Sequence, residues 1–392
     1  MKITQVEALL LRGEQAYQTH ASADEASDLG QYQMLVRVAT DEGLTGWSDC
    51  ETLGPAAIAV INGQGLGVMG FKTMRELLVG RDPLAVEANW DHAYIGSNYY
   101  GRRGLAMQCL SAIDNCLWSI RAQAAGLPLH SLLGGARVDR LPAYASTLYR
   151  DTPAGNAEAA RGYLARGFRA IKFGWGVLGE DPGRDVEAAA AIREAIGPER
   201  DFMLDPGWYS VAWKGPWRPR SERDNHALCQ RFAPYRPLWL EDFIHPEDYE
   251  QYARVRAASP VPIAAGEQLA THWDFERFMR GRGSDFIQPD LSRCGGLTVA
   301  RKIVALAEQL GQEVVCHSWL SDLLHGYSLH LACTLARPRF LEFNVSQSPL
   351  TRGICGGALS LNPDGTVSLP SGSGLGLSVD EDFIRHHRVA SA

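Results

Sequence analysis

The 392-residue chain lacks the features that would place it at once among membrane, secreted or zinc-binding proteins. No uncharged apolar run approaches the roughly 18 residues of a transmembrane helix, and the apolar residues 8–11 are too few for a secretory signal. The eight cysteines form no Cys-x-x-Cys pair, and neither His-x-His nor His-Glu-x-x-His occurs, which argues against zinc sites and redox dithiols. We therefore expect a cytoplasmic protein with reduced thiols.

Positive charge is scarce as well. The formal net charge is −7, and no dense cluster of Lys and Arg occurs, which argues against a nucleic-acid partner. Hydrophobic residues make up 45% and charged residues 21% of the chain, which is typical of a globular protein and excludes a wholly disordered one. We expect a small-molecule substrate as the partner, and neither nucleic acid nor a membrane.

The first third of the chain is organised differently from the rest. Residues 1–50 have the pattern of a β-meander with a turn near Gly43, and residues 55–125 favour helices. Strands followed by helices predict a small α+β domain over residues 1–125. The Gly-rich residues 350–392 again lack a regular pattern, and we expect them to return and complete this domain.

A regular alternation of strands and helices begins near residue 140, and we assign residues 126–349 to a catalytic barrel domain. Short apolar strands recur about every 30 residues, the length of one βα unit. Two of the helices between them end where Gly197 and Gly311 can serve as C-terminal caps. Eight strands with intervening helices predict an α/β fold with a TIM-like (β/α) barrel. The predicted strands cover residues 142–146, 169–173, 202–205, 238–242, 262–265, 285–288, 313–316 and 340–343.

Ionisable residues stand at or just beyond the ends of seven successive predicted strands. The catalytic side chains of such barrels gather at the C-terminal ends of the strands. A single charge at a strand end is usually only solvated, because charged side chains are mostly exposed. Seven of them in otherwise apolar segments indicate a functional site. They are Lys172, Asp205, Glu241, Glu267, Asp290, His317 and Glu342.

The residue types suit particular roles in acid–base chemistry. Asp205, Glu241 and Glu267 belong to consecutive strands, and their carboxylates would repel one another without a cation between them. All-oxygen ligation suits Mg²⁺, which is the cofactor that we predict. On the next two strands, Asp290 can orient the imidazole of His317 and raise its basicity, which predicts a general base.

Two further residues complete the predicted barrel mouth. Lys172 supplies a fixed positive charge across the opening. Glu342, if protonated, could donate a hydrogen bond to an anionic intermediate, and the alternative is a buried structural acid.

Short motifs along nearly the whole chain resemble the mandelate racemase-like group of the enolase superfamily. They are Gly101-Arg102-Arg103-Gly104, Ala112-Ile113-Asp114, Leu240-Glu241-Asp242, Ala265-Gly266-Glu267-Gln268, Gln288-Pro289-Asp290, Gly295-Gly296-Leu297-Thr298 and Cys316-His317-Ser318-Trp319. The resemblance implies that the first domain caps the barrel, that the three carboxylates bind Mg²⁺ and that Asp290 and His317 form a catalytic dyad. It also implies that Lys172 and Glu342 flank the substrate. Superfamily sites use a Lys or His base with Mg²⁺ stabilising an ene-diolate.

The second barrel strand departs from the pattern of the racemases in this group. They usually carry Lys-x-Lys there, whereas this chain has Lys172-Phe173-Gly174. Racemisation needs an acid–base group on each face of the planar intermediate, but elimination of water needs only one. The sequence therefore favours a lyase, a dehydratase that converts a sugar acid into a 2-keto-3-deoxy acid. The alternatives are a racemase or epimerase of a 2-hydroxy acid and a catalytically silent ligand-binding member.

Substrate contacts are predicted from the ends of other strands and from loops. The long segment 207–225 contains three tryptophans and several arginines, which fits either a lid over the barrel or an oligomer contact. Barrels of this group are commonly multimers, so we expect a homo-oligomer. The candidate substrate contacts are His20, Tyr17, Thr147, Tyr149 and Trp319.

Overall fold

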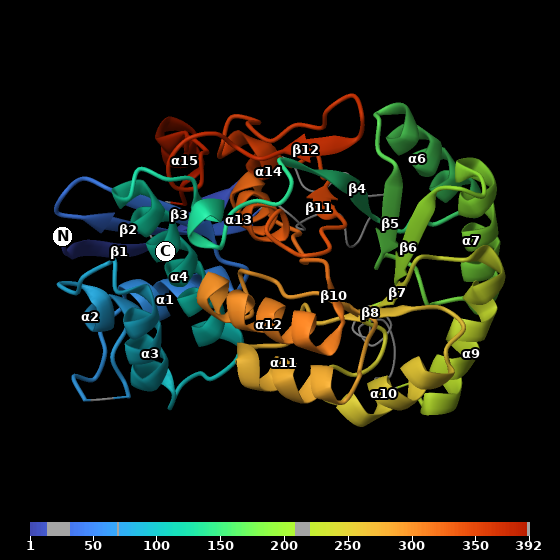
Figure 1. Ribbon diagram of the computed structural model, residues 1–392, viewed down its shortest axis with the longest axis horizontal. Helices are drawn as coiled ribbons and strands as arrows, with labels where there is room; N and C mark the ends of the chain where they lie inside the picture. Colours follow the sequence, from blue (N-terminus) through green and yellow to red (C-terminus); the bar gives the residue numbers. More distant parts are fainter. Residues whose placement is uncertain (14–31, 69, 208–219, 390–392) are drawn as a thin grey trace.

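The computed structural model describes residues 1–13, 32–68, 70–207 and 220–389, which form an N-terminal capping domain packed on an α/β barrel (Figure 1). The capping domain holds a three-stranded sheet in which β1 pairs with β2 and β2 with β3, both antiparallel. This is the predicted meander followed by helices. The strands are β1 (Ile3–Arg12), β2 (Tyr32–Thr40) and β3 (Thr45–Asp49), and the helices are α1 (Gly54–Asn62), α2 (Met74–Leu78), α3 (Val86–Ser97), α4 (Gly104–Ala124) and α5 (Leu129–Leu132).

The barrel is built from eight parallel strands. Their order in the sheet is β10-β9-β8-β7-β6-β5-β4-β11, so β11, the last barrel strand, lies beside β4, the first. Each predicted strand is present within a few residues of its expected bounds. The strands are β4 (Arg140–Leu148), β5 (Ala170–Gly174), β6 (Asp201–Asp205), β7 (Leu240–Glu241), β8 (Ile263–Ala265), β9 (Phe286–Ile287), β10 (Glu313–Val314) and β11 (Leu341–Asn344).

The sheet curls around one inner core to which every strand, or a residue next to it, contributes. The ring of Tyr144 on β4 lies 5.9 Å from that of Trp239 beside β7 and 6.0 Å from that of Phe340 beside β11. Strands from both ends of the sheet therefore share one interior, as a barrel requires. The inner core comprises Tyr144, Ala170, Met203, Trp239, Ala264, Phe286, Val315 and Phe340.

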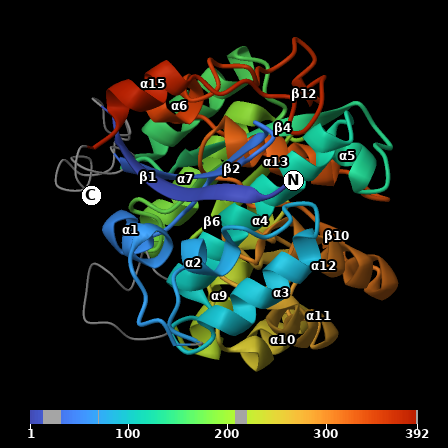
Figure 2. The same cartoon turned by 90° about the vertical axis from the view of Figure 1, so that its left-hand side faces the viewer.

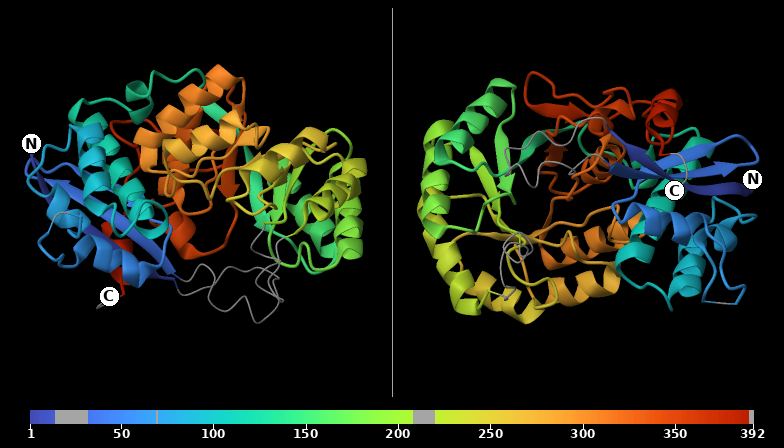
Figure 3. Two further views of the ribbon diagram at one scale, coloured as in Figure 1. Left: turned by 90° about the horizontal axis from the view of Figure 1, so that it is seen from below. Right: turned by 180° about the vertical axis from the view of Figure 1, so that it is seen from behind.

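Helices cover the outside of the barrel (Figure 3). Two of them end at the predicted glycine caps, where Gly197 has φ 77° and Gly311 has φ 67°, values that favour glycine. No helix that the structure describes has the length and apolar character needed to cross a membrane. The helices are α6 (Pro153–Ala165), α7 (Pro182–Ile196), α9 (Glu222–Phe232), α10 (Tyr249–Ala258), α11 (Thr271–Arg280), α12 (Gly296–Leu310) and α13 (Asp322–Ala332), with a 3₁₀ turn η1 at Ala233–Tyr235.

Polar residues form the next layer of the barrel interior. Side chains alternate along a strand, so the residue two positions beyond each inner-core residue faces the same interior, nearer the C-terminal mouth. After β8, the residue that faces the interior is Glu267 and not residue 266. Residue 266 is a glycine with φ +137°, and a Cβ there would lie 3.0 Å from the Gln288 nitrogen, so this position has no room for a side chain. The other members of this layer are Ser146, Lys172, Asp205, Glu241, Gln288, His317 and Glu342.

The C-terminal tail packs against both domains. Its strand β12 (Thr366–Ser368) pairs antiparallel with Arg140–Pro142, the first residues of β4. The pairing of β4 with β11 begins at the next residue, Ala143. Helix α15 (Glu381–His387) lies beside β1, and the Val389 amide donates to the Leu10 carbonyl at 2.9 Å (Figure 2). The remaining element is α14 (Pro349–Gly353). We predicted that residues 350–392 would complete the capping domain. Helix α15 contacts that domain, whereas β12 pairs with the barrel strand β4. The division between residues 125 and 126 stays a prediction.

A buried polar junction fixes the capping domain to the barrel. On α4, Asp114 accepts hydrogen bonds from the Thr298 amide at 2.8 Å and from the Thr298 hydroxyl at 2.7 Å. The indole of Trp118 donates to the same hydroxyl at 2.9 Å. The close approach requires glycine at 296, where a Cβ would lie 2.5 Å from a carboxylate oxygen of Asp114. The first turn of α12 is thus held by α4.

Asp114 gives this junction a pH dependence. Burial raises the pKa of Asp114 to about 7. Because the unfolded chain then loses this proton at lower pH than the folded one, the contribution of Asp114 to stability is largest in acid and falls as the pH rises from about 4 to 7. We expect Asp114→Asn to remove this part of the slope, as measured by urea unfolding at several pH values. Identical pH profiles for the variant and the wild type would contradict the assignment.

Candidate active site

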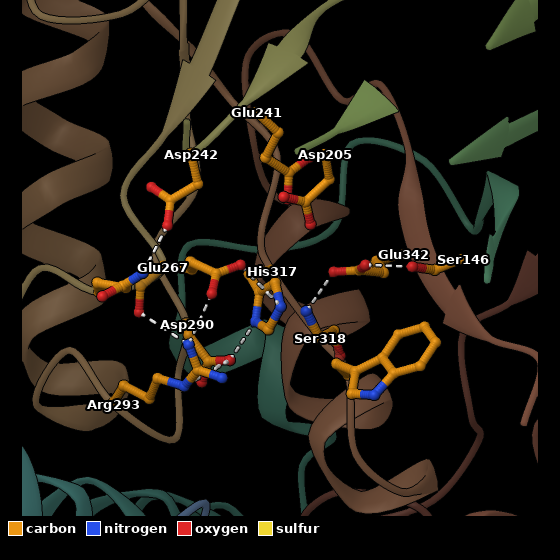
Figure 4. Close-up of polar contacts among 12 residues, drawn as sticks. Ser146, Asp205, Glu241, Asp242, Glu267, Asp290, Arg293, His317, Ser318 and Glu342 are labelled. Carbon is orange, nitrogen blue, oxygen red and sulfur yellow. Dashed lines mark hydrogen bonds and ion pairs between the residues drawn. The ribbon is translucent and has the colours of Figure 1, made fainter. Parts of the chain in front are cut away.

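Three buried carboxylates meet at the mouth of the barrel (Figure 4). Asp205 ends β6, Glu241 ends β7 and Glu267 follows β8, and each offers an oxygen within 4.8 Å of the other two. Burial and the neighbouring charge of Glu241 raise the pKa of Asp205 well above its usual value. The buried Oδ1 of Asp205 has no hydrogen-bond partner among the described residues. Clustered carboxylates with an unsatisfied oxygen fit a divalent cation with oxygen ligands.

Lys172 lies on one side of this cluster. Its Nζ is 2.5 Å from Glu241 Oε1, 2.9 Å from Glu342 Oε1 and 3.7 Å from Asp205 Oδ2. Burial favours a neutral amine, but Glu241 and Glu342 raise the pKa of Lys172 well above its usual value. The indole of Trp239 donates to the second oxygen of Glu241 at 2.7 Å and fixes the carboxylate in place.

Glu342 is held as a carboxylate. It accepts from the Ser146 hydroxyl at 2.7 Å and from the Ser318 amide at 2.6 Å, besides its contact with Lys172. Burial would raise the pKa of Glu342, but Lys172, His317 and these hydrogen bonds lower it to about 2. The expected role as a protonated donor therefore has no support in this geometry. The arrangement fits a residue that orients Lys172.

His317 and Asp290 form a buried pair on the other side. The Nδ1 atom of His317 is 2.6 Å from Asp290 Oδ2, and its Nε2 atom is 3.2 Å from Glu267 Oε2. The Ser292 amide and hydroxyl both donate to Asp290 Oδ1 at 2.6 Å. Burial would lower the pKa of His317, but Glu267, Glu342 and Asp290 raise it to about 10. A cation on Glu267 would oppose that effect. Asp290 therefore fixes the ring so that Nε2 faces the carboxylate cluster.

Arg293 is part of the site, although the sequence analysis did not select it. Its guanidinium is 3.0 Å from Glu267 Oε1 and 2.5 Å from Glu51 Oε1, and Nε is 4.0 Å from Asp290 Oδ2. Glu51, Asp290 and His317 could by their spacing hold a second cation. Because the guanidinium already contacts two of these three, the Asp205 cluster is the better candidate. Arg293 follows Asp290 by three residues, whereas the sequence carries no signal for Glu51.

Two of the predicted substrate contacts face away from the mouth. The Thr147 hydroxyl lies 2.9 Å from the Tyr163 hydroxyl on α6, and the Tyr149 hydroxyl donates to the Asp185 carbonyl on α7 at 3.0 Å. Thr147 occupies an outward position of β4 and Tyr149 directly follows this strand, and their contacts with α6 and α7 hold both side chains away from the interior. Trp319 is half-buried directly after Ser318, near Glu342. His20, Tyr17 and residues 208–219 of the Trp-rich segment lie outside the described residues.

Gly174 occupies the position where racemases of this group carry their second Lys. A Cβ at residue 174 would lie 2.8 Å from Asp205 Cβ and 3.0 Å from Asp205 Oδ2. A side chain on this strand position would therefore displace one of the three clustered carboxylates. In this arrangement, position 174 holds no acid–base group opposite His317.

Comparisons with known proteins agree with this architecture. Residues 156–383 match the family described as enolase C-terminal domain-like, and residues 21–134 match the mandelate racemase / muconate lactonizing enzyme N-terminal domain. The fold and the two matches define an enolase-type barrel protein. The chain belongs to the enolase superfamily, in its mandelate racemase/muconate lactonizing enzyme group.

Relatives in this group include enzymes named for sugar acids and for a sugar-acid lactone. The chain is 30% identical over 373 residues to a D-galactarolactone cycloisomerase of Agrobacterium fabrum, with 91% of each chain covered. It is 31% identical over 373 residues to a D-galactonate dehydratase of Ralstonia pickettii, with 90% of each covered. A crystal structure of the 3,6-anhydro-D-galactonate cycloisomerase from Zobellia galactanivorans matches all of both chains, with a TM-score of 0.85 and 26% identity.

Members of the superfamily use a divalent metal. A solved racemase from Streptomyces coelicolor A3(2), described with bound magnesium, has a TM-score of 0.82 and 26% identity over 99% of this chain and 100% of its own. The Asp205, Glu241 and Glu267 cluster is the candidate metal site in this protein.

Replacing one carboxylate of the cluster tests the candidate cation site. We expect Glu241→Gln to weaken Mg²⁺ binding at least about tenfold in calorimetric titration, because one charged ligand is lost. Glu276→Gln, which changes an exposed carboxylate on α11, should leave the affinity unchanged. Unaltered Mg²⁺ binding by Glu241→Gln would exclude this site.

Gly174→Ala tests the close approach to Asp205. We expect a loss of about 1–3 kcal/mol in unfolding free energy from overpacking, together with weaker Mg²⁺ binding. Gly162→Ala is a matched control, because a Cβ on that α6 position meets no atom within 4 Å. Urea unfolding and Mg²⁺ titration of both variants provide the measurement; equal behaviour of the two would refute the packing argument.

Proposed function

We propose that this protein is a Mg²⁺-dependent dehydratase of a sugar acid, an aldonate or an aldarate, that forms a 2-keto-3-deoxy acid. The observation that carries the proposal is the placement of one imidazole, with its orienting carboxylate, beside three clustered carboxylates, while position 174, where racemases of this group carry a second Lys, is glycine. The dehydratases among its relatives support the same chemistry.

The cation site would hold the substrate carboxylate. When bound, Mg²⁺ would coordinate that carboxylate and stabilise the negative charge that develops on it. Lys172 lies between Glu241 and Glu342 and would place a fixed positive charge beside the same group. Glu342 would keep the lysine in this position.

His317 would carry out both proton transfers. Its Nε2 takes the proton from the carbon next to the carboxylate, while Asp290 accepts from Nδ1 and stabilises the imidazolium. The electron pair of the broken C–H bond forms a C=C bond as the β C–O bond breaks. The imidazolium then returns the proton to the departing oxygen, which leaves as water. The resulting enol tautomerises to the 2-keto acid.

A racemase or epimerase would need a second group on the opposite face of the intermediate. Position 174 cannot supply it, because its Cβ would collide with Asp205. Lys172 makes close contacts with Glu241 and Glu342, which keep it protonated. These observations favour elimination over racemisation.

A cycloisomerase of a sugar-acid lactone is a second candidate, favoured by the 30% identity with the D-galactarolactone enzyme. The residue roles would be the same. The leaving oxygen would be the ring oxygen on the β-carbon, so that elimination opens the ring instead of releasing water.

A panel of aldonates, aldarates and their lactones distinguishes these activities. We expect 2-keto-3-deoxy product from at least one free acid in the presence of Mg²⁺. Product from lactones alone would instead support the cycloisomerase. Deuterium at C2 of recovered substrate in D₂O, with no keto acid, would indicate a racemase or epimerase.

His317→Asn tests the assigned base. We expect a fall in turnover of the acid of about 10²- to 10⁴-fold, as is usual for loss of a general base. The exposed His386→Asn should retain full activity. Product formation by His317→Asn at the wild-type rate would overturn the role of this residue. If the wild type and His317→Asn bind the acid equally well and neither turns it over, the protein is a silent ligand-binding member.

A further inference from the structure

The end of strand β3 joins the capping domain to the start of α13 in the barrel domain. Asp49, its last residue, accepts hydrogen bonds from the Ser321 amide at 3.2 Å, the Ser321 hydroxyl at 2.8 Å and the Leu324 amide at 3.0 Å. Ser321, four residues after His317, is the N-cap of α13, and Leu324 lies in the first turn of this helix. Asp49 is completely buried, so the contact is a fixed one. The residues that follow β3 therefore start from an anchored point.

Glu51, two residues after this anchor, makes a two-pronged ion pair with Arg293. Arg293 Nη2 is 2.5 Å from Glu51 Oε1, and Nε donates to Glu51 Oε2 at 3.0 Å. Paired contacts of this kind fix the plane of a guanidinium as well as its distance. The pair joins the two domains, and only about a fifth to a quarter of either side chain is exposed.

The remaining donor of Arg293 is directed at the candidate site. Its Nη1 donates to the Glu267 side chain at 3.0 Å and approaches the Glu267 carbonyl at 3.4 Å, while Nε lies 4.0 Å from Asp290 Oδ2. Arg293 thus touches a carboxylate of the candidate cation cluster and lies beside the carboxylate that orients His317. The guanidinium already donates to one oxygen of Glu267. Without Glu51, it would be free to move further onto this carboxylate and compete with a cation for the Glu267 oxygens.

We propose that Glu51 is a positioning residue of the capping domain: by fixing Arg293, it sets the carboxylates of Glu267 and Asp290 for cation binding and for proton transfer at His317. This inference rests on the cation site and the dyad of the proposed function. Glu51 acts through Arg293, so its effect depends on that side chain. The Glu51–Arg293 pair thus couples the attachment of the capping domain to the geometry of the site.

A double-mutant cycle on Mg²⁺ affinity tests the proposal without any substrate. We expect Glu51→Gln to weaken Mg²⁺ binding about tenfold, within the range for residues that hold a ligand in place. In an Arg293→Met background, the same Glu51→Gln change should alter the affinity less than twofold. Arg293→Lys, which keeps the charge without the paired contact, should also remove the dependence on Glu51. Thermal unfolding without metal verifies that each variant is folded.

Glu247→Gln is the matched control. Glu247 also pairs across the domain boundary, with Arg103 at the start of α4, but neither residue contacts the carboxylate cluster. Breaking this pair should leave Mg²⁺ affinity unchanged. With an acid that the wild type dehydrates, Glu51→Gln at saturating Mg²⁺ should lower kcat about tenfold and change KM less than twofold, because Glu51 would act on the dyad and not on the substrate.

Each outcome separates this inference from the proposed function. Wild-type Mg²⁺ binding that Glu51→Gln leaves intact would overturn the positioning role and leave the proposed function standing. Equal losses in the Arg293 and Arg293→Met backgrounds would also overturn it, because Glu51 would then act independently of Arg293. A wild-type protein that binds no Mg²⁺ would defeat the cation site itself, and this inference with it.

Discussion

Mutual repulsion of buried carboxylates is the constraint on which this site depends. Asp205, Glu241 and Glu267 lie within a few ångströms of one another in an interior with little water to screen them. Such a cluster persists only if positive charge surrounds it. Lys172 on one side and Arg293 on the other provide part of that charge. The remaining unsatisfied oxygen on Asp205 is where a divalent cation would complete the balance.

The barrel strands bring these charged side chains together at the mouth. The apolar inner layer of the barrel closes the interior, and the next residues in the same alternation can face only the mouth. Charged side chains from segments far apart in the sequence thereby converge at the mouth, some on the strands and others, such as Glu267 and His317, on the residues just beyond them. Gly266 makes a local adjustment, because its backbone conformation lets Glu267, just beyond β8, take the inward position. The regular alternation of the strands therefore brings the site together, and the residues just beyond the strand ends complete it.

The capping domain is part of this geometry and more than a cover. It is fixed to α12 by Asp114 and to α13 by Asp49, both buried. Between these anchors, Glu51 reaches Arg293 beside the dyad. A domain held at two buried polar junctions can position an active-site residue across a sequence separation that no local motif spans.

The sequence alone was enough to predict the barrel, its eight strands and the seven ionisable residues at their ends, because strand period and chain spacing are local properties. It also sufficed for the family, which the matched domains confirm. Only the tertiary structure decided which way Thr147 and Tyr149 face, that Glu342 is held as a carboxylate, and that Arg293 and Glu51 meet. Those outcomes depend on which face of a strand each side chain takes and on contacts between distant segments. The Glu51–Arg293 pair, for example, joins residues 242 positions apart, and no spacing in the chain encodes that contact.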